Sequence, residues 1–431
     1  MKRLILCGVG SLLMLSMSAG FGFPSDSTLQ LQELIEEALQ NNPELQASYN
    51  GWKATEAGVS QAASLPDPVL GFNLMNLPTN SYQFDQEPMS GKQISLMQMF
   101  PFPGKLSLKE KIAGESAKVK GLQYQELQNQ LIKNLKSTYY NLFYIDKAIE
   151  TSEKNTTLLK QFTQIAETRY RVGKGLQQDV LRSQVELSKI TEKLIGLKQK
   201  RIALAAQLNT LLNRPPEKAI GKIDDLQEIS LELDFSQLKA LAEEHRPFLK
   251  AWEAMVRQGQ QKVQLAKKGY LPDFNLGIGY TQRDVLKNGM GGVDYLSGMV
   301  NMTLPLYFWK KQNKKVQEEQ LNEISLNKHY ESVRQQVQGE LEIKLNDLRK
   351  NQQLLELYKG GIIIQASQAL QSSLAAYQVN KVDFLTVLNN QMMLFNYELE
   401  YYRVLSDYHK TVAELEAIVG KRLVENSLER R

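Results

Sequence analysis

The stretch "YRVGKGLQQDVL", Tyr170–Leu181, interrupts a run of residues that otherwise favours one continuous helix. Two glycines within three residues, Gly173 and Gly175, destabilise a helix interior, yet glycine adopts positive φ at little steric cost. We therefore predict that the chain reverses its direction here, with both glycines at the tip of a helical hairpin.

The same pattern returns 207 residues later as "YQVNKVDFLTVL", Tyr377–Leu388, with the tyrosine, valine, lysine and final Val-Leu at the same spacing. Asn380 stands where the first copy has Gly173, and asparagine is the residue that best tolerates positive φ after glycine. The second stretch therefore predicts a second hairpin tip.

Other motifs recur at offsets of 204 to 207 residues, which indicates two copies of one unit. The matched pairs are "NNPEL" (Asn41–Leu45) with "HRPFL" (His245–Leu249), "LPDPVLG" (Leu65–Gly71) with "LPDFNLG" (Leu271–Gly277), and "FPFPGK" (Phe100–Lys105) with "LPLYFW" (Leu304–Trp309). The predicted organisation is a first structural repeat over 23–214, a linker over 215–235, a second structural repeat over 236–421 and a C-terminal tail over 422–431.

Long helices are expected on both sides of each turn. No proline occurs between Pro103 and Pro215 or after Pro305, and these segments are rich in good helix formers. At about 1.5 Å per residue, a helix over Lys105–Arg171 reaches roughly 100 Å. Heptad repeats in the returning segments predict antiparallel coiled-coil hairpins. The seam residues are Leu187, Ile190, Leu194, Leu197, Leu204, Leu208 and Leu211 in the first copy, and Leu394, Tyr397, Tyr401, Val404, Tyr408, Leu415 and Ile418 in the second.

Each copy also contains two segments in which apolar residues alternate with small or polar ones. Their length and single apolar face are typical of tilted strands in a membrane barrel, although a soluble sandwich edge produces the same alternation. Four strands are too few to close a barrel, which needs about eight, so copies of the chain would have to share strands. The predicted strands cover about 69–77, 92–100, 274–281 and 296–304, and the residues expected to face lipid are Leu276, Ile278, Val300 and Met302.

The N-terminus indicates export. Residues 1–22 carry Lys2 and Arg3, then an apolar run, then small residues, as a signal peptide does. The only cysteine, Cys7, lies inside this segment, so the mature chain is expected to contain no thiol. The net charge of +5 is too small to indicate a nucleic-acid partner.

Taken together, the duplicated motifs resemble the TolC-type outer-membrane efflux protein family. They include "LQLQELIEEALQNNPEL" (Leu29–Leu45), the two "LPD" strand starts, the prolines Pro101 and Pro305 after the strands, and the two turn motifs. The resemblance implies a mainly α-helical chain with four transmembrane strands. It also implies a homotrimer in the outer membrane, with a 12-stranded barrel continued by a helical tunnel in the periplasm.

The resemblance further implies a passive channel that works with a periplasmic adaptor and an inner-membrane transporter. The segment "QMFPFPGKLSLKEKIA" (Gln98–Ala113) is most similar to the branch that serves heavy-metal pumps of the resistance-nodulation-division type. Heavy-metal cations are therefore one candidate substrate class, beside drugs and other small molecules. The alternative is a periplasmic adaptor or coiled-coil scaffold, which usually carries one hairpin between two halves of a small β domain.

No enzyme chemistry or resident cofactor is predicted. The histidines His245, His329 and His409 are isolated and have no partner at the spacing of a zinc site. A group of methionines surrounds the first strand pair, and thioethers do bind cuprous ions, but methionine in or near a lipid-facing strand is more often plain apolar surface. The methionines are Met75, Met89, Met97 and Met99.

Candidate functional residues lie at the hairpin tips. In the family that the chain resembles, acidic residues ring the periplasmic end and links between helices hold it closed. Here Thr386 and Asn389 occupy the positions of two expected aspartates, which puts a strong acidic ring in doubt. We predict instead a charged link among Asp179, Arg182 and Asp383, whose alternative is ordinary solvated helix charge.

Overall fold

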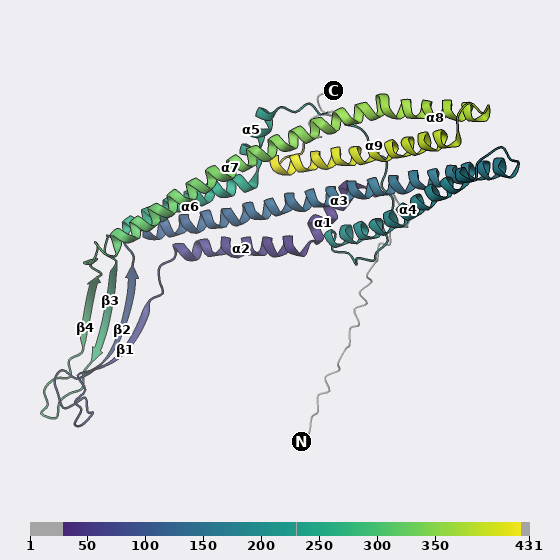
Figure 1. The fold of residues 1–431 in the computed structure, drawn as a ribbon. Helices are drawn as coiled ribbons and strands as arrows, with labels where there is room; N and C mark the ends of the chain where they lie inside the picture. The colour runs from purple at the N-terminus through teal and green to yellow at the C-terminus, as the bar shows by residue number, and fades with distance from the viewer. Residues whose placement is uncertain (1–28, 230, 424–431) are drawn as a thin grey trace, which may run out of the picture.

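The computed structural model describes residues 29–229 and 231–423, so the predicted signal peptide 1–22 and all but the start of the predicted tail lie outside the described residues. The chain is a long rod of helices with one small β-sheet at its end (Figure 1). The helices are α1 (Leu31–Asn41), α2 (Pro43–Ala63), α3 (Lys105–Arg171), α4 (Gln177–Leu211), α5 (Phe235–His245), α6 (Pro247–Lys268), α7 (Gln312–Leu357), α8 (Ile363–Gln378) and α9 (Phe384–Val419), with a π-helical turn η1 (Tyr358–Ile362) between α7 and α8. The strands are β1 (Val69–Met75), β2 (Gly91–Phe100), β3 (Phe274–Gln282) and β4 (Tyr295–Met302).

The longest helix, α3, contains 67 residues and has the bounds that the proline distribution predicts. Gly104 caps its start with φ 90°, directly after Pro103. In the second copy the corresponding rod runs from α7 through η1 into α8. The π-turn at Gly360 and Gly361 was not expected, because two glycines that cost helix stability do not by themselves predict a change of helix type.

Two antiparallel hairpins, α3 with α4 and α8 with α9, form the far end of the rod (Figure 1). The predicted seam residues pack inward, with Ile190 and Leu208 buried in α4 and Tyr408 and Leu415 buried in α9. Helix α9 packs against α3, so the two hairpins share one apolar core near their tips. Members of this core include Phe162 and Ala166 of α3, Ile190 of α4, Leu370 of α8, and Phe384, Val387 and Phe395 of α9.

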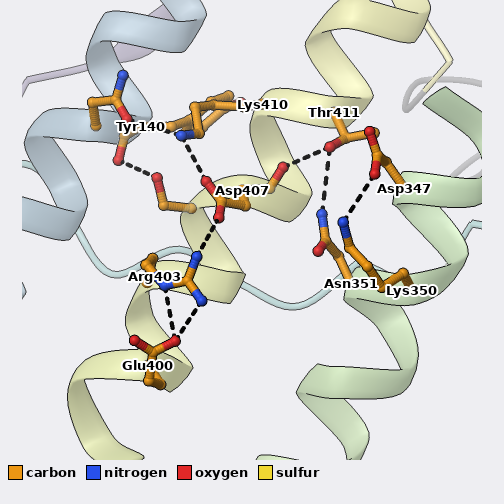
Figure 2. A network of polar contacts seen from close by, with 11 residues as sticks. Tyr140, Asp347, Lys350, Asn351, Glu400, Arg403, Asp407, Lys410 and Thr411 are labelled. Carbon is orange, nitrogen blue, oxygen red and sulfur yellow. Dashed lines mark hydrogen bonds and ion pairs between the residues drawn. The ribbon is translucent and has the colours of Figure 1, made fainter. Parts of the chain in front are cut away.

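Polar contacts attach the middle of α9 to both of its neighbours (Figure 2). Toward α3, the Ser406 hydroxyl donates to the carbonyl of Tyr140 at 2.7 Å. Toward α7, the Asn351 amide contacts the Thr411 hydroxyl at 3.4 Å. On α9 itself, Asp407 and Lys410 form an ion pair at 2.7 Å, so these two charges compensate each other. Helix α9 therefore lies between α3 and α7.

The segment between the two copies has no helix or strand over 213–229 and 231–234. It crosses α7 and α9 and is held to them by its carbonyl groups. The Gln352 amide donates to the carbonyl of Leu231 at 3.0 Å, and the His409 ring nitrogen Nε2 lies 3.0 Å from the carbonyl of Gln227. Because a carbonyl oxygen only accepts, Nε2 carries the proton. The segment thus wraps the middle of the rod as a belt.

The four strands form one antiparallel sheet in the order β1-β2-β3-β4. The contact between β2 and β3 joins the strand pairs of the two copies, with Leu96 opposite Ile278. The strands were expected from their alternation, and the observed ends differ from the expected ones by at most two residues. Both edges of the sheet, β1 and β4, are open. No described helix is long and apolar enough to cross a membrane.

Candidate functional site

Both hairpin tips close with the same backbone motif. In the first, Gly173 has φ 71° and the Lys174 amide donates to the carbonyl of Arg169 at 2.8 Å. In the second, Asn380 has φ 59° and the Lys381 amide donates to the carbonyl of Ala376 at 2.9 Å. These bonds span five residues and end a helix in a left-handed residue. Asparagine thus takes the place of glycine at an equivalent turn.

Gly175 does not have the role predicted for it, because Gly173 is the one glycine of this turn with positive φ. Gly175 matters through close approach instead. A Cβ atom added there would lie 3.0 Å from the Cβ of Arg169 and 3.1 Å from the backbone nitrogen of Tyr170. The second copy has Val382 at this place.

The two aspartates of the predicted gate lie near each other at the tips. Asp179 is half-buried in the first turn of α4, and its pKa is raised by burial and by the negative charge of Asp383, against a hydrogen bond with the backbone of Leu176. Asp383 caps α9 by accepting from the amide of Thr386 at 2.8 Å, and hydrogen bonds from Thr386 lower the pKa of Asp383. Thr386 therefore supports a carboxylate rather than replacing one.

Arg182 does not complete the link that the sequence predicts. It is exposed, and among the described residues it forms no ion pair with Asp179 or Asp383. The reason is geometric, since Asp179 turns toward the second hairpin and Arg182 lies on the solvent side of α4. Asn389 is likewise exposed on α9. At the tip of one chain, the charge of Asp383 thus acts on Asp179, and neither carboxylate forms an ion pair among the described residues.

The contact that does join the tips was missed in the sequence. Arg169, in the last turns of α3, donates from Nη1 to the side-chain oxygen of Asn380 at 2.9 Å and from Nη2 to the carbonyl of Tyr377 at 3.3 Å. Its guanidinium also lies 4.1 Å from the centre of the Tyr377 ring, in cation–π geometry. The available signal was a cation in the last turn of α3, which also has the simpler explanation of a favourable helix C-terminus.

Deeper along the hairpins, a buried polar pair bridges α3 and α9. The Gln391 amide donates to the side-chain oxygen of Asn155 at 2.6 Å, and both residues are buried. The side-chain amide nitrogen of Asn155, Nδ2, has no hydrogen-bond partner among the described residues. A buried donor without a partner costs about 1 to 3 kcal/mol, so this polar level stabilises the bundle less than the apolar core on either side does.

The opposite end of the molecule has a sheet with two different faces. One face is apolar and exposed, with Ile278 62% and Val300 72% accessible. The other is lined by small residues, where a Cβ added to Gly279 would meet Ser297 and Gln93 at 2.9 to 3.0 Å. The four residues predicted to face lipid share the exposed face, because pairing and alternation place them there: Leu276, Ile278, Val300 and Met302.

Comparisons with known proteins agree with this architecture. The chain is 24% identical to the outer membrane protein TolC of Escherichia coli over 424 residues, covering 93% of this chain and 83% of that protein. It is 21% identical to the cobalt-zinc-cadmium resistance protein CzcC of Cupriavidus metallidurans over 419 residues, covering 93% and 92%. Among solved structures, the outer-membrane channel OprN superposes with a TM-score of 0.78 at 17% identity, covering 90% of this chain and 89% of that chain.

The family profile described as outer membrane efflux protein matches residues 34–214 and 238–421, which is most of the chain. TolC is an outer membrane protein and OprN an outer-membrane channel by name, and the matches indicate no catalytic function. Two helical hairpins on one four-stranded sheet are also not what an adaptor or scaffold predicts. The chain belongs to the outer membrane efflux protein family and is an outer-membrane protein.

Proposed function

We propose that this chain is the outer-membrane channel of a tripartite efflux system, acting as a homotrimer with a 12-stranded barrel. The observation that carries the proposal is the open four-stranded sheet, which has an apolar face and two unpaired edges and continues into a rod of helices. A single chain leaves both edges unsatisfied. Three copies supply the strands for a closed barrel, and their helices continue it as a tunnel into the periplasm.

The chain is further proposed to consist of two structural repeats, 23–214 and 236–421, joined by the linker 215–235. A signal peptide over 1–22 would precede them, and a tail over 422–431 would follow. The two separate segments matched by the family profile support this division, as does the recurrence of a left-handed residue at both tips. Duplication gives each chain two similar walls of the tunnel.

The hairpin tips are the proposed place for docking of a periplasmic adaptor and for closure of the tunnel. The turns at Gly173, Gly175 and Asn380 lie at the end of the rod farthest from the sheet (Figure 1). In the trimer, the exposed Arg182 of one chain would face a neighbouring chain, where carboxylates equivalent to Asp179 and Asp383 are proposed to accept it. The channel itself performs no chemistry, because the inner-membrane transporter of the resistance-nodulation-division type supplies the energy.

Heavy-metal cations are the proposed cargo. Support comes from the similarity to CzcC along nearly the whole of both chains and from the segment Gln98–Ala113. A passive duct needs no tight metal site, and the described residues contain no cluster of three or more His, Asp or Glu side chains able to hold a metal ion. Drugs and other small molecules are the competing cargo, since the chain is also 23% identical over 230 residues to the toxin and drug export protein A of Aggregatibacter actinomycetemcomitans.

Two measurements test these proposals. Purified protein in mild detergent should have the mass of three chains and should form discrete conducting channels in a planar bilayer. A monomer without conductance would contradict the channel proposal. For the cargo, cells that lack this protein should become sensitive to Co²⁺, Zn²⁺ or Cd²⁺ while retaining their resistance to hydrophobic drugs; the reverse pattern would contradict the metal assignment.

A further inference from the structure

The junction between sheet and helices contains an ion pair that joins the two copies. The Asp273 carboxylate, directly before β3, accepts from the Lys105 ammonium at 2.8 Å and from the backbone amide of Phe102 at 2.7 Å. Lys105 also donates to the carbonyl of Leu271 at 2.9 Å. Both charged side chains are mostly buried, with 12% and 23% of their surfaces accessible. The start of one copy's strand pair is thereby fastened to the end of the other's.

The residue that corresponds to Asp273 in the first copy is Asp67, in "LPDP" before β1. Asp67 is exposed, and among the described residues no hydrogen bond or ion pair is formed by its carboxylate. The segment after β4 corresponds to the segment after β2. Pro305 takes the place of Pro101, and Lys310 follows Pro305 at nearly the same distance along the chain as Lys105 follows Pro101.

The side chains of this second segment are largely exposed in one chain. Leu306, Tyr307 and Trp309 are exposed large apolar residues, with 65%, 69% and 53% of their surfaces accessible. Lys310 is exposed and forms no ion pair among the described residues. Asp67 and Lys310 cannot meet within the chain, because they lie beside the two opposite open edges of the sheet, β1 and β4. Each sheet therefore has half of one junction beside its β1 edge and the other half beside its β4 edge.

We propose that Asp67 of one chain receives the segment after β4 of the next chain, with Lys310 as its cation. The contact repeats between chains the junction that Asp273 and Lys105 form within a chain. Going round the barrel, within-chain and between-chain junctions then alternate, so that each strand pair is fastened to the next. This inference rests on the proposed homotrimer and specifies which side chains close it.

Cysteine cross-linking between different chains tests the contact directly. Two forms of the full-length chain, Asp67→Cys and Lys310→Cys, are co-expressed with distinct tags, purified from the membrane and treated with a short bismaleimide. A cross-linked dimer that carries both tags is expected. The matched control is Asp273→Cys on one form and Lys105→Cys on the other, which should give no mixed dimer, because that junction lies within a chain.

Charge reversal supplies an independent measurement. Asp67→Lys and Lys310→Asp should each raise the dissociation constant of the trimer at least about tenfold, since breaking a partly buried pair leaves one charge without its partner. The combined Asp67→Lys/Lys310→Asp chain should recover most of this loss. The inference is overturned if a trimeric wild type gives neither the mixed dimer nor recovery in the combined variant. A wild type that is itself monomeric would instead overturn the proposed function.

Discussion

At the residue scale, Arg169 is the contact that we expect to hold the two tips of one chain together. Arg169→Gln removes two hydrogen bonds and the stacking on Tyr377, worth about 1 to 3 kcal/mol per chain. Single-channel conductance in a planar bilayer should therefore rise. Arg171→Gln is the control, because Arg171 is exposed and, within the part of the chain that the structure describes, pairs only with Glu167 at 3.8 Å.

Arg182→Ser separates this contact from the proposed link between chains. If contacts between neighbouring chains close the tunnel, Arg182→Ser opens it and high salt partly reproduces the effect by screening. If Arg169 closes it within the chain, Arg182→Ser behaves like the control. Wild-type conductance in both variants would show that neither arginine takes part in closure.

His409 should make the stability of the rod depend on pH. Burial lowers the pKa of His409 from 6.5 to about 4, while its hydrogen bond to the carbonyl of Gln227 acts in the opposite direction. The unfolded chain therefore binds more protons between pH 6.5 and 4, and stability falls as the pH drops through this window. The loss between pH 7.5 and pH 5 should be about 2 kcal/mol per chain.

The measurement is the thermal midpoint of wild type and His409→Gln at both pH values, followed by circular dichroism. Glutamine keeps a donor for the carbonyl of Gln227 but does not titrate. The thermal midpoint of the variant should therefore fall less on acidification than that of the wild type. Carboxylates elsewhere titrate equally in both proteins and cancel in the difference. Equal losses would show that His409 is protonated without opening the belt.

The residues at the tips also show which features of the site can be predicted from the sequence and which cannot. Gly173 and Asn380 could be matched because a left-handed position restricts the residue type locally. Arg169 could not be assigned, because its partners Tyr377 and Asn380 lie more than two hundred residues away on another hairpin. Nothing local to Arg169 records that α3 and α9 pack side by side. The same holds for Asp179, whose pKa is raised in part by the charge of Asp383 on the second hairpin.

At the element scale, the two faces of the sheet should respond differently to charge. Ile278→Arg places a cation on the exposed apolar face, which should cost about 2 to 4 kcal/mol near the bilayer midplane and reduce the yield of assembled channel. Ser297→Arg, on the opposite face of the neighbouring strand, should instead alter conductance and preserve yield. The readouts are the amount of trimer in outer-membrane fractions and its conductance. Equal yields for the two variants would mean that Ile278 does not face lipid.

The elements themselves were largely predictable. Strand ends followed from two-residue alternation, and α3 from the absence of proline, because each signal is carried by the segment itself. The π-turn η1 was not, since Gly360 and Gly361 allow several helical geometries and their surroundings decide among them. The belt over 213–229 and 231–234 was predicted only as a linker. Several of its anchors are carbonyl groups, which every sequence has, and the Glu228 carboxylate accepts from Lys359 and Tyr401, which lie far away in the sequence.

At the scale of the whole molecule, the two lateral surfaces of the helical layer remain apolar. On α4, Leu181, Ile195 and Ile202 are exposed at intervals that are multiples of seven residues, apart from the inward seam. On the opposite side, α7 carries Ile343 and Leu357, which are exposed at twice the heptad interval before the π-turn η1 shifts the helical phase. Stripes at heptad spacing are what a neighbouring helix covers in a coiled coil. Since the two stripes lie on different sides, each would be covered by another copy in a closed ring.

Ile195→Glu/Ile202→Glu should therefore prevent assembly without unfolding the chain. Both side chains are 62% accessible in one chain, so the substitution costs little within it, whereas burying two carboxylates against the apolar side of a neighbour costs several kcal/mol. Light scattering in detergent should show single chains, and circular dichroism should show unchanged helix content. Gln184→Glu/Gln199→Glu adds the same charge to exposed polar positions of α4 and should remain trimeric. If both variants assemble equally, the α4 stripe faces solvent, and closure of the ring must depend on the strands and on the junctions beside them.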